Sequence, residues 1–138
     1  WAVAIGGGVN HRMGLYDAIM LKDNNSDFCG ELDLALAKTK AYVGALDKPV
    51  TVIVETRNLK EVDVCLQNPW ISRVLLDNMS PKELALAVSH INGNIPTEAS
   101  GNIDLENVAT YAETGVDYVS MGVITHAASI VDLSLGAV

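Results

Sequence analysis

Short apolar runs that end in polar residues or glycine recur five times along this 138-residue chain. Most of these runs precede a segment with helical periodicity, and the alternation is typical of βα units. Strands that alternate with helices form a parallel sheet, in which neighbouring strands end at one common edge. We therefore predict that the polar strand ends converge and form a site. These ends are 22–24 after the run 18–21, Glu55 after 50–54, 77–78 after 74–76, 98–101 after 96–97, and Gly122 after 118–121.

The same patterns predict where each element begins and ends. Strands are expected at 1–5, 18–21, 50–54, 73–76 and 118–121. A further, short strand is expected to end at Glu98. Helices are expected at 31–46, 58–66, 80–91 and 104–113, the last capped by Asp104, with a short terminal segment at 131–135. Two helix starts have the spacing of a capping box, with Asn58 three residues before Glu61 and Ser80 three residues before Glu83.

Two α/β architectures fit this order of elements: a doubly wound open sheet and part of a (β/α) barrel. No Gly-x-Gly-x-x-Gly motif follows the first strand, which weakens the dinucleotide-binding option. Polar residues after every strand favour the barrel, whose active site lies at the ends of all its strands. A complete barrel usually needs more than about 200 residues. The chain, which starts at Trp1, is therefore expected to be a partial chain that forms an incomplete TIM-like barrel.

Composition excludes several classes of function. Half of the residues are apolar and the formal net charge is −8, without a dense run of Lys or Arg, so we expect no nucleic-acid partner. No apolar run approaches the ~18 residues of a membrane span, so we expect no membrane partner. The two cysteines, Cys29 and Cys65, are expected to be reduced thiols of a cytoplasmic protein. The three histidines are too scattered to predict a zinc site.

Candidate cationic and acidic residues occur in the first half of the chain. His11 and Arg12 follow three glycines, and the planar fork of Arg suits a carboxylate or a phosphate. Lys22 is either an ion-paired residue of the sheet edge or a cation that binds substrate. Glu55 and Asp77, at successive strand ends, can bind a hard cation such as Mg²⁺, stabilise developing positive charge or move protons. The alternative is that both acids pair with Lys22 and Arg12 for structure.

Two loops in the second half are candidates for phosphate binding, because backbone N–H groups at helix N-termini donate hydrogen bonds to anions. They are Ser100, Gly101 and Asn102, and then Met121, Gly122 and Val123. Barrels often bind phosphate at the loops after their last strands. Together with the cations and acids, these loops indicate a ligand with a phosphate, further anionic groups and a metal. A sugar phosphate that carries pyrophosphate fits this description.

The chain strongly resembles the quinolinate phosphoribosyltransferases in seven segments, in order and at the spacing of that family. These are GGGVNHRMGLYD at 6–17, MLKDN at 20–24, Val54-Glu55, LLDNM at 75–79, EASG at 98–101, TGVDY at 114–118 and Thr125-His126. The related molybdenum-associated pyrophosphorylases have Pro before the His and lack Lys-Asp-Asn, so the chain sides with the quinolinate enzymes.

The resemblance implies that residues 1–138 are the larger part of a C-terminal barrel domain, with an N-terminal sandwich domain absent from this chain. It implies a cytoplasmic homodimer that joins quinolinate to phosphoribosyl pyrophosphate, with Mg²⁺, and releases pyrophosphate, CO₂ and nicotinate mononucleotide for NAD biosynthesis. In that reading His11, Arg12 and Lys22 bind quinolinate, and Lys22, Glu55 and Asp77 are catalytic. Glu55 and Asp77 also serve the metal, directly or through water, and the two loops hold the 5′-phosphate.

Some positions depart from the family pattern. The family often has His at Asn25, a second Glu at Ile53, a second Gly at Asn102 and Ser at Ala127. These departures motivate a second reading, in which the chain is a non-catalytic phosphate-binding or structural fragment of the same fold. Family segments that contribute Arg and Lys residues precede the barrel portion, so this chain alone is expected to be poorly active.

Overall fold

A computed structural model of the chain describes residues 1–14, 16–24, 30–126, 133 and 135. Within these residues, five strands form one parallel sheet in the sequential order β1-β2-β3-β4-β5. A sequential order of parallel strands is that of a (β/α) barrel wall, whereas a doubly wound sheet reverses its order at a switch point. The strands are β1 (Ala18–Leu21), β2 (Thr51–Thr56), β3 (Arg73–Asp77), β4 (Thr97–Ser100) and β5 (Tyr118–Val119).

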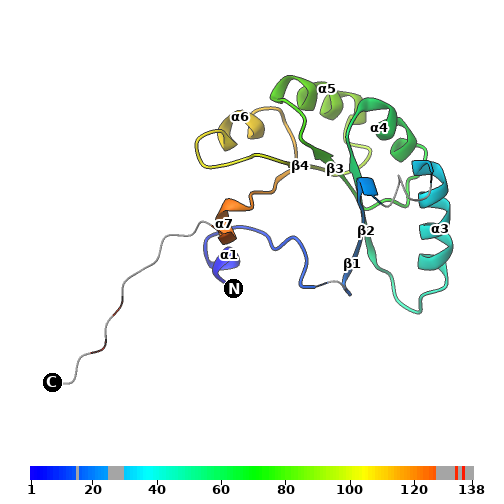
Figure 1. Cartoon of the computed structure of the whole chain (residues 1–138), viewed down its shortest axis with the longest axis horizontal. Helices are drawn as coiled ribbons and strands as arrows, with labels where there is room; N and C mark the ends of the chain where they lie inside the picture. The colour runs from blue at the N-terminus through cyan, green and yellow to red at the C-terminus, as the bar shows by residue number, and fades with distance from the viewer. Residues whose placement is uncertain (15, 25–29, 127–132, 134, 136–138) are drawn as a thin grey trace.

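Helices cover the outer face of this curved sheet (Figure 1). The helices α3 to α6 follow the strands around the outside, whereas α1 and α7 lie on the open, concave side (Figure 1). This one-sided cover identifies the wall of an incomplete barrel and confirms the predicted fold class. The helices are α1 (Ala2–Ile5), α3 (Leu32–Gly44), α4 (Leu59–Leu66), α5 (Pro81–Ile91), α6 (Val108–Ala112) and α7 (Val123–His126).

The hydrophobic core lies between the sheet and the outer helices. Alternate residues of a strand point to opposite faces, so one set of apolar residues faces the helices and the other faces the concave side. Both sets are apolar in the middle of the sheet, which is why the strands read as unbroken apolar runs. The fully buried core contains Val52, Val54, Val74 and Leu76 from the strands, and Leu36, Val62, Leu84, Ala87 and Ile91 from the helices.

Local sequence signals explain where the two best-defined helices begin. Ser80 caps α5 in a complete capping box, in which its side chain accepts from Glu83 N and the Glu83 carboxylate accepts from Ser80 N. Asn58 caps α4 by accepting from Glu61 N at 3.1 Å. Both caps were predicted from spacing alone, and each fixes the point at which the chain turns from a strand end into a helix.

Three predicted elements differ from the structure. Residues 1–5 were expected to form a strand, but Ala2–Ile5 is a single helical turn, and none of the five described strands pairs with it. The helix expected from Asp104 begins only at Val108, because Asp104 instead accepts from the amides of Glu106 and Asn107 and forms a turn. The last strand ends at Val119, two residues early.

Some predictions are decided only in part. Cys65 is a free, buried thiol, as expected, whereas Cys29 lies outside the described residues. The predicted segment 131–135 also lies mostly outside them, as do the departures at Asn25 and Ala127. Across the described part of the chain, no helix combines the length and the apolar character needed to cross a membrane.

Candidate active site

A cavity of about 1060 Å³ opens on the concave side of the sheet, at the carboxyl ends of the strands. Residues at or just after all five described strands line it, together with parts of the segments that contain α1 and α7. The strand ends therefore converge, as the parallel topology predicts. All the site residues predicted from the sequence line this cavity: His11, Arg12, Lys22, Glu55, Asp77, Ser100, Gly101, Asn102, Met121, Gly122 and Val123. Their individual roles stay predictions.

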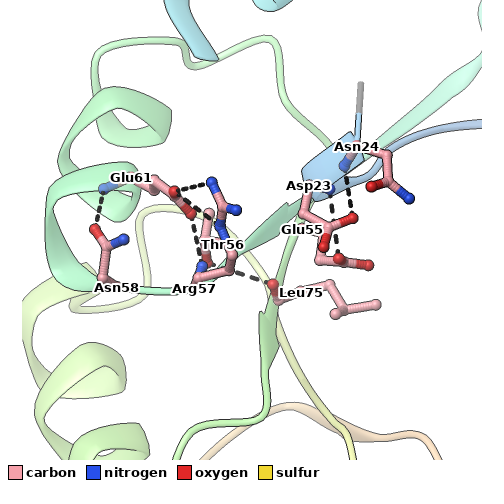
Figure 2. A network of polar contacts seen from close by, with 8 residues as sticks. All are labelled: Asp23, Asn24, Glu55, Thr56, Arg57, Asn58, Glu61 and Leu75. Atoms are coloured by element: carbon pink, nitrogen blue, oxygen red, sulfur yellow. Dashed lines mark hydrogen bonds and ion pairs between the residues drawn. The ribbon is translucent and has the colours of Figure 1, made fainter. Parts of the chain in front are cut away.

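Glu55 extends from the end of β2 toward Asp23, on the concave side. Figure 2 shows its carboxylate beside the backbone of Asp23 and away from the Arg57–Glu61 pair, which lies at the start of α4. The Asp23 amide donates to Glu55 Oε1 at 3.5 Å (Figure 2). Desolvation by burial raises the pKa of Glu55, and the negative charge of Asp77 raises it further, whereas the Asp23 amide and Lys22 lower it. Glu55 and Asp77 are thus close enough to interact electrostatically.

The loop that carries His11 and Arg12 is closed at its end by the carboxylate of Asp17. Asp17 accepts from the backbone amides of Met13 at 2.8 Å and Gly14 at 3.0 Å. These two amides hold the pKa of Asp17 below its usual range, with a smaller contribution from the nearby Arg12 guanidinium. Asp17 is therefore ionised at neutral pH, and it closes the turn that follows Arg12.

The loop after β4 depends on a glycine. Gly101 has φ +93°, and a Cβ at this position would lie 2.9 Å from Asn78 N and even closer to the Asn78 side chain. Asn78 in turn accepts from Asn102 Nδ2 at 3.0 Å and donates to the Asp77 carboxylate. Asn102 itself has φ 54°, a left-handed conformation that Asn tolerates. The predicted phosphate loop is thus joined through two amides to a carboxylate of the same cavity.

The loop after β5 enters the cavity beside the first. Ser120 N donates to Ala99 O at 2.9 Å, which extends the pairing of β4 and β5 by one residue beyond the strand. Thr125 Oγ1 donates to Gly122 O at 3.0 Å and stabilises the turn that leads into α7. Gly122 and Thr125 both line the cavity. The two predicted phosphate loops therefore face one volume.

A polar cluster around Glu98 was predicted only in part, because Glu98 was among the strand ends expected to converge but its partners were not foreseen. Glu98, on β4, is fully buried, and its Oε2 accepts from Arg73 Nη1 at 2.9 Å. Its Oε1 lies 3.2 Å from His11 Nε2 and also accepts from the Ser120 hydroxyl. The Arg73 guanidinium stacks on the Tyr118 ring, 4.0 Å from its centre. The available signal was an acidic residue inside a short strand, at a position that alternates onto the concave face.

The donor set of the cavity fits Mg²⁺ better than a softer metal. Glu55 and Asp77 supply carboxylate oxygens, the ligands that this hard cation prefers. The described residues contain no group of three or more His, Cys, Asp or Glu that could hold a metal by themselves. Mg²⁺ commonly uses one or two carboxylates together with the phosphates of its substrate, so a pair of carboxylates is a consistent set.

Comparisons with known proteins agree with this geometry. The profile of the family described as quinolinate phosphoribosyl transferase, C-terminal domain, matches residues 1–136. The mitochondrial, decarboxylating quinolinate phosphoribosyltransferase 2 of Nicotiana glauca is 41% identical over 149 residues, which cover 98% of this chain and 42% of the relative. The carboxylating nicotinate-nucleotide pyrophosphorylase of Mycobacterium leprae is 40% identical over 139 residues, which cover 98% of this chain and 47% of the relative.

Solved structures show the same similarity. The crystal structure of NadC from Streptococcus pyogenes superposes with a TM-score of 0.88 at 36% identity, over 99% of this chain and 47% of that one. The chain thus spans less than half the length of these relatives. The matched residues include every position that lines the predicted site. The chain belongs to the quinolinate phosphoribosyl transferase family and corresponds to its C-terminal domain.

Proposed function

We propose that the chain is the barrel portion of an enzyme that transfers the phosphoribosyl group of phosphoribosyl pyrophosphate to quinolinate. The reaction releases pyrophosphate and CO₂ and forms nicotinate mononucleotide, a precursor of NAD. The observation that carries the proposal is one cavity lined by cationic side chains, by the carboxylates of Glu55 and Asp77 and by two glycine-containing loops. The names of the relatives, quinolinate phosphoribosyltransferase and nicotinate-nucleotide pyrophosphorylase, support it over a non-catalytic fragment.

In this proposal the cationic side of the cavity binds quinolinate. Quinolinate is a dicarboxylate, so it requires donors that can face two negative groups. Arg12 offers a planar pair of donors for one carboxylate, and Lys22 offers a compact ammonium group for the other. His11 adds a ring nitrogen at the same wall of the cavity. These three residues orient the pyridine ring relative to the ribose.

Glu55 and Asp77 act on the ribose. Departure of pyrophosphate leaves positive charge on the ribosyl group, and two fixed carboxylates at the strand ends stabilise that charge as it develops. This role requires Glu55 to be ionised, which the Asp23 amide and Lys22 favour against the effect of burial on its pKa. The same carboxylates would hold Mg²⁺, directly or through water, and the ion would supply positive charge to the pyrophosphate group.

The loops 100–102 and 121–123 bind the 5′-phosphate in this proposal. Residues of both loops line the cavity, and neither loop adds a negative side chain to it. The positive φ of Gly101 turns the chain so that the amides after it can face an anion. We further propose that the complete enzyme acts as a homodimer. Its cytoplasmic location stays a prediction from the sequence.

The experiment that tests the proposal is a pair of alanine substitutions in the complete enzyme. Lys22→Ala removes a cation from the cavity, and we expect it to abolish quinolinate-dependent release of pyrophosphate without changing the thermal midpoint. Lys82→Ala, on the exposed side of α5, is the matched control and should leave turnover unchanged. Near-normal turnover of Lys22→Ala would contradict the role of Lys22. Calorimetry that detects neither quinolinate nor phosphoribosyl pyrophosphate with Mg²⁺ on the folded enzyme would contradict the function itself.

A further inference from the structure

We infer that Glu98 is a positioning residue that fixes the imidazole of His11 at the quinolinate side of the cavity. The inference rests on the proposed function, in which His11 contacts quinolinate. Glu98 does not need to touch the substrate for this role. It acts through His11. One of its two carboxylate oxygens pairs with Arg73 of the sheet, and the other contacts His11, which lines the cavity.

Glu98 joins three segments that are far apart in the sequence. Arg73 comes from the beginning of β3, Ser120 from the residue after β5, and His11 from the loop after α1. The parallel register places Glu98 between Leu75 of β3 and Tyr118 of β5, so its side chain enters the concave face at the middle of the sheet. From there its Oε1 reaches His11 at 3.2 Å.

The division between the two carboxylate oxygens separates a structural role from a positioning role. A buried carboxylate without partners is strongly unfavourable, and Arg73 compensates its charge through Oε2 at 2.9 Å. The stacking of Arg73 on Tyr118 fixes this pair within the sheet. Charge compensation alone does not require the contact of Oε1 with His11. That contact instead ties a glycine-rich loop to the rigid wall of the barrel.

The contact also bears on which ring nitrogen of His11 carries hydrogen. A carboxylate oxygen accepts hydrogen bonds, so the 3.2 Å approach of Nε2 to Glu98 Oε1 favours hydrogen on Nε2. The ring is then fixed in orientation, and Nδ1 is left on the other side of the imidazole. His11 is followed directly by Arg12, so fixing the ring also restricts where the guanidinium can enter the cavity.

The test compares two substitutions, each of which removes the carboxylate that contacts a histidine. Glu98→Gln alters the buried contact with His11, whereas Asp63→Asn alters the exposed contact with His90, where Asp63 Oδ1 lies 2.6 Å from Nε2. Calorimetric titrations of the complete enzyme measure affinity for quinolinate and, separately, for phosphoribosyl pyrophosphate with Mg²⁺. Since hydrogen bonds to charged groups are the stronger ones, we expect Glu98→Gln to weaken quinolinate binding by about tenfold. We expect Asp63→Asn to change neither affinity.

Affinity for phosphoribosyl pyrophosphate distinguishes a positioning role of Glu98 from a general distortion of the site. Ser100 of the phosphate loop lies two residues after Glu98 on the same strand, so a distorted β4 would weaken both ligands. Loss of quinolinate affinity with retained affinity for phosphoribosyl pyrophosphate supports the inference. Unchanged quinolinate affinity in Glu98→Gln, or an equal loss for both ligands, overturns it.

A measurement on the unsubstituted enzyme covers the case in which Glu98→Gln does not fold. Long-range proton–nitrogen correlation spectra show which histidine nitrogens carry hydrogen, and we expect hydrogen on Nε2 of His11. A His11 ring that carries hydrogen only on Nδ1 overturns the inference. If the expected His11 signal is present but the unsubstituted enzyme binds no quinolinate, the proposed function fails while the Glu98–His11 contact stands. The two failures are thus distinguishable.

Discussion

Substitution of Gly101 by alanine should destabilise the protein more than the same change at another glycine with a similar backbone. Gly101 has φ +93°, and an L-residue held in such a conformation costs about 1–3 kcal/mol. The added Cβ would also lie 2.9 Å from Asn78 N and closer still to the Asn78 side chain, so something must move. Forcing an extra carbon into a packed site costs a further 1–3 kcal/mol, roughly. We therefore expect Gly101→Ala to lose about 2–6 kcal/mol.

Gly93 is the matched control, because it separates backbone strain from the clash. It follows the end of α5 with φ +72°, and a Cβ there would meet nothing within 4 Å. Gly93→Ala should therefore cost only the strain of about 1–3 kcal/mol. Urea unfolding of the two variants, each followed by circular dichroism, measures the difference. We expect Gly101→Ala to be the less stable variant by about 1–3 kcal/mol.

The clash also has a local consequence that stability alone does not report. Displacement of Asn78 breaks its hydrogen bonds with Asn102 and Asp77. Phosphoribosyl pyrophosphate should then bind more weakly to Gly101→Ala and normally to Gly93→Ala, as measured by calorimetry. Equal losses of stability in the two variants, together with unchanged side-chain amide signals of Asn78, would refute this reasoning.

Three further predictions concern single groups. Ser80→Ala removes the capping box of α5 and should lower the free energy of urea unfolding by about 1 kcal/mol, so an unchanged midpoint would argue against the cap. In carboxyl NMR titrations, Glu55 should titrate above and Glu83 below the ordinary glutamate pKa of 4.5, because burial raises the first and the Ser80 hydroxyl lowers the second. Glu83 therefore contributes stability that is present above its unfolded pKa and is lost as pH falls through its folded pKa. The contribution of Glu55 has the opposite sign: it is present at low pH and is lost as pH rises through its folded pKa. Burial raises the pKa of Cys65 to about 12, so in a Cys29→Ser background it should react with thiol reagents only as the protein unfolds, and rapid labelling of the native protein would contradict this.

Much of the fold was predictable because its signals are local. Ser80 and Asn58 mark helix starts through partners only three residues away, and the apolar runs of β2 and β3 are long enough to identify as strands. Residues 1–5 were misassigned because a run of that length fits a strand and a helical turn equally well. Asp104 was misread as a cap, since the same side chain that caps helices also forms turns.

The candidate site also contains contacts that the sequence could predict and contacts that it could not. Lys22, Glu55 and Asp77 could be predicted to meet, because the parallel topology alone brings strand ends together. The contacts of Glu98 could not, because its partner Arg73 is 25 residues away and their meeting depends on the exact strand register. His11 is more distant still, and its position depends on a loop rather than on any element with a readable period.

The placement of the core on one face of the sheet has a consequence for how such a domain changes over evolutionary time. Val54 and Leu76 pack against the helices, whereas their sequence neighbours Glu55 and Asp77 face the cavity. Each strand therefore contributes side chains to two separate tasks at adjacent positions. Substitutions on the cavity side can alter the ligand one strand at a time while the packing that holds the domain together is kept. Glu98 is the exception, because replacing it affects Arg73, Ser120 and His11 together, so this position can change only in concert with its partners.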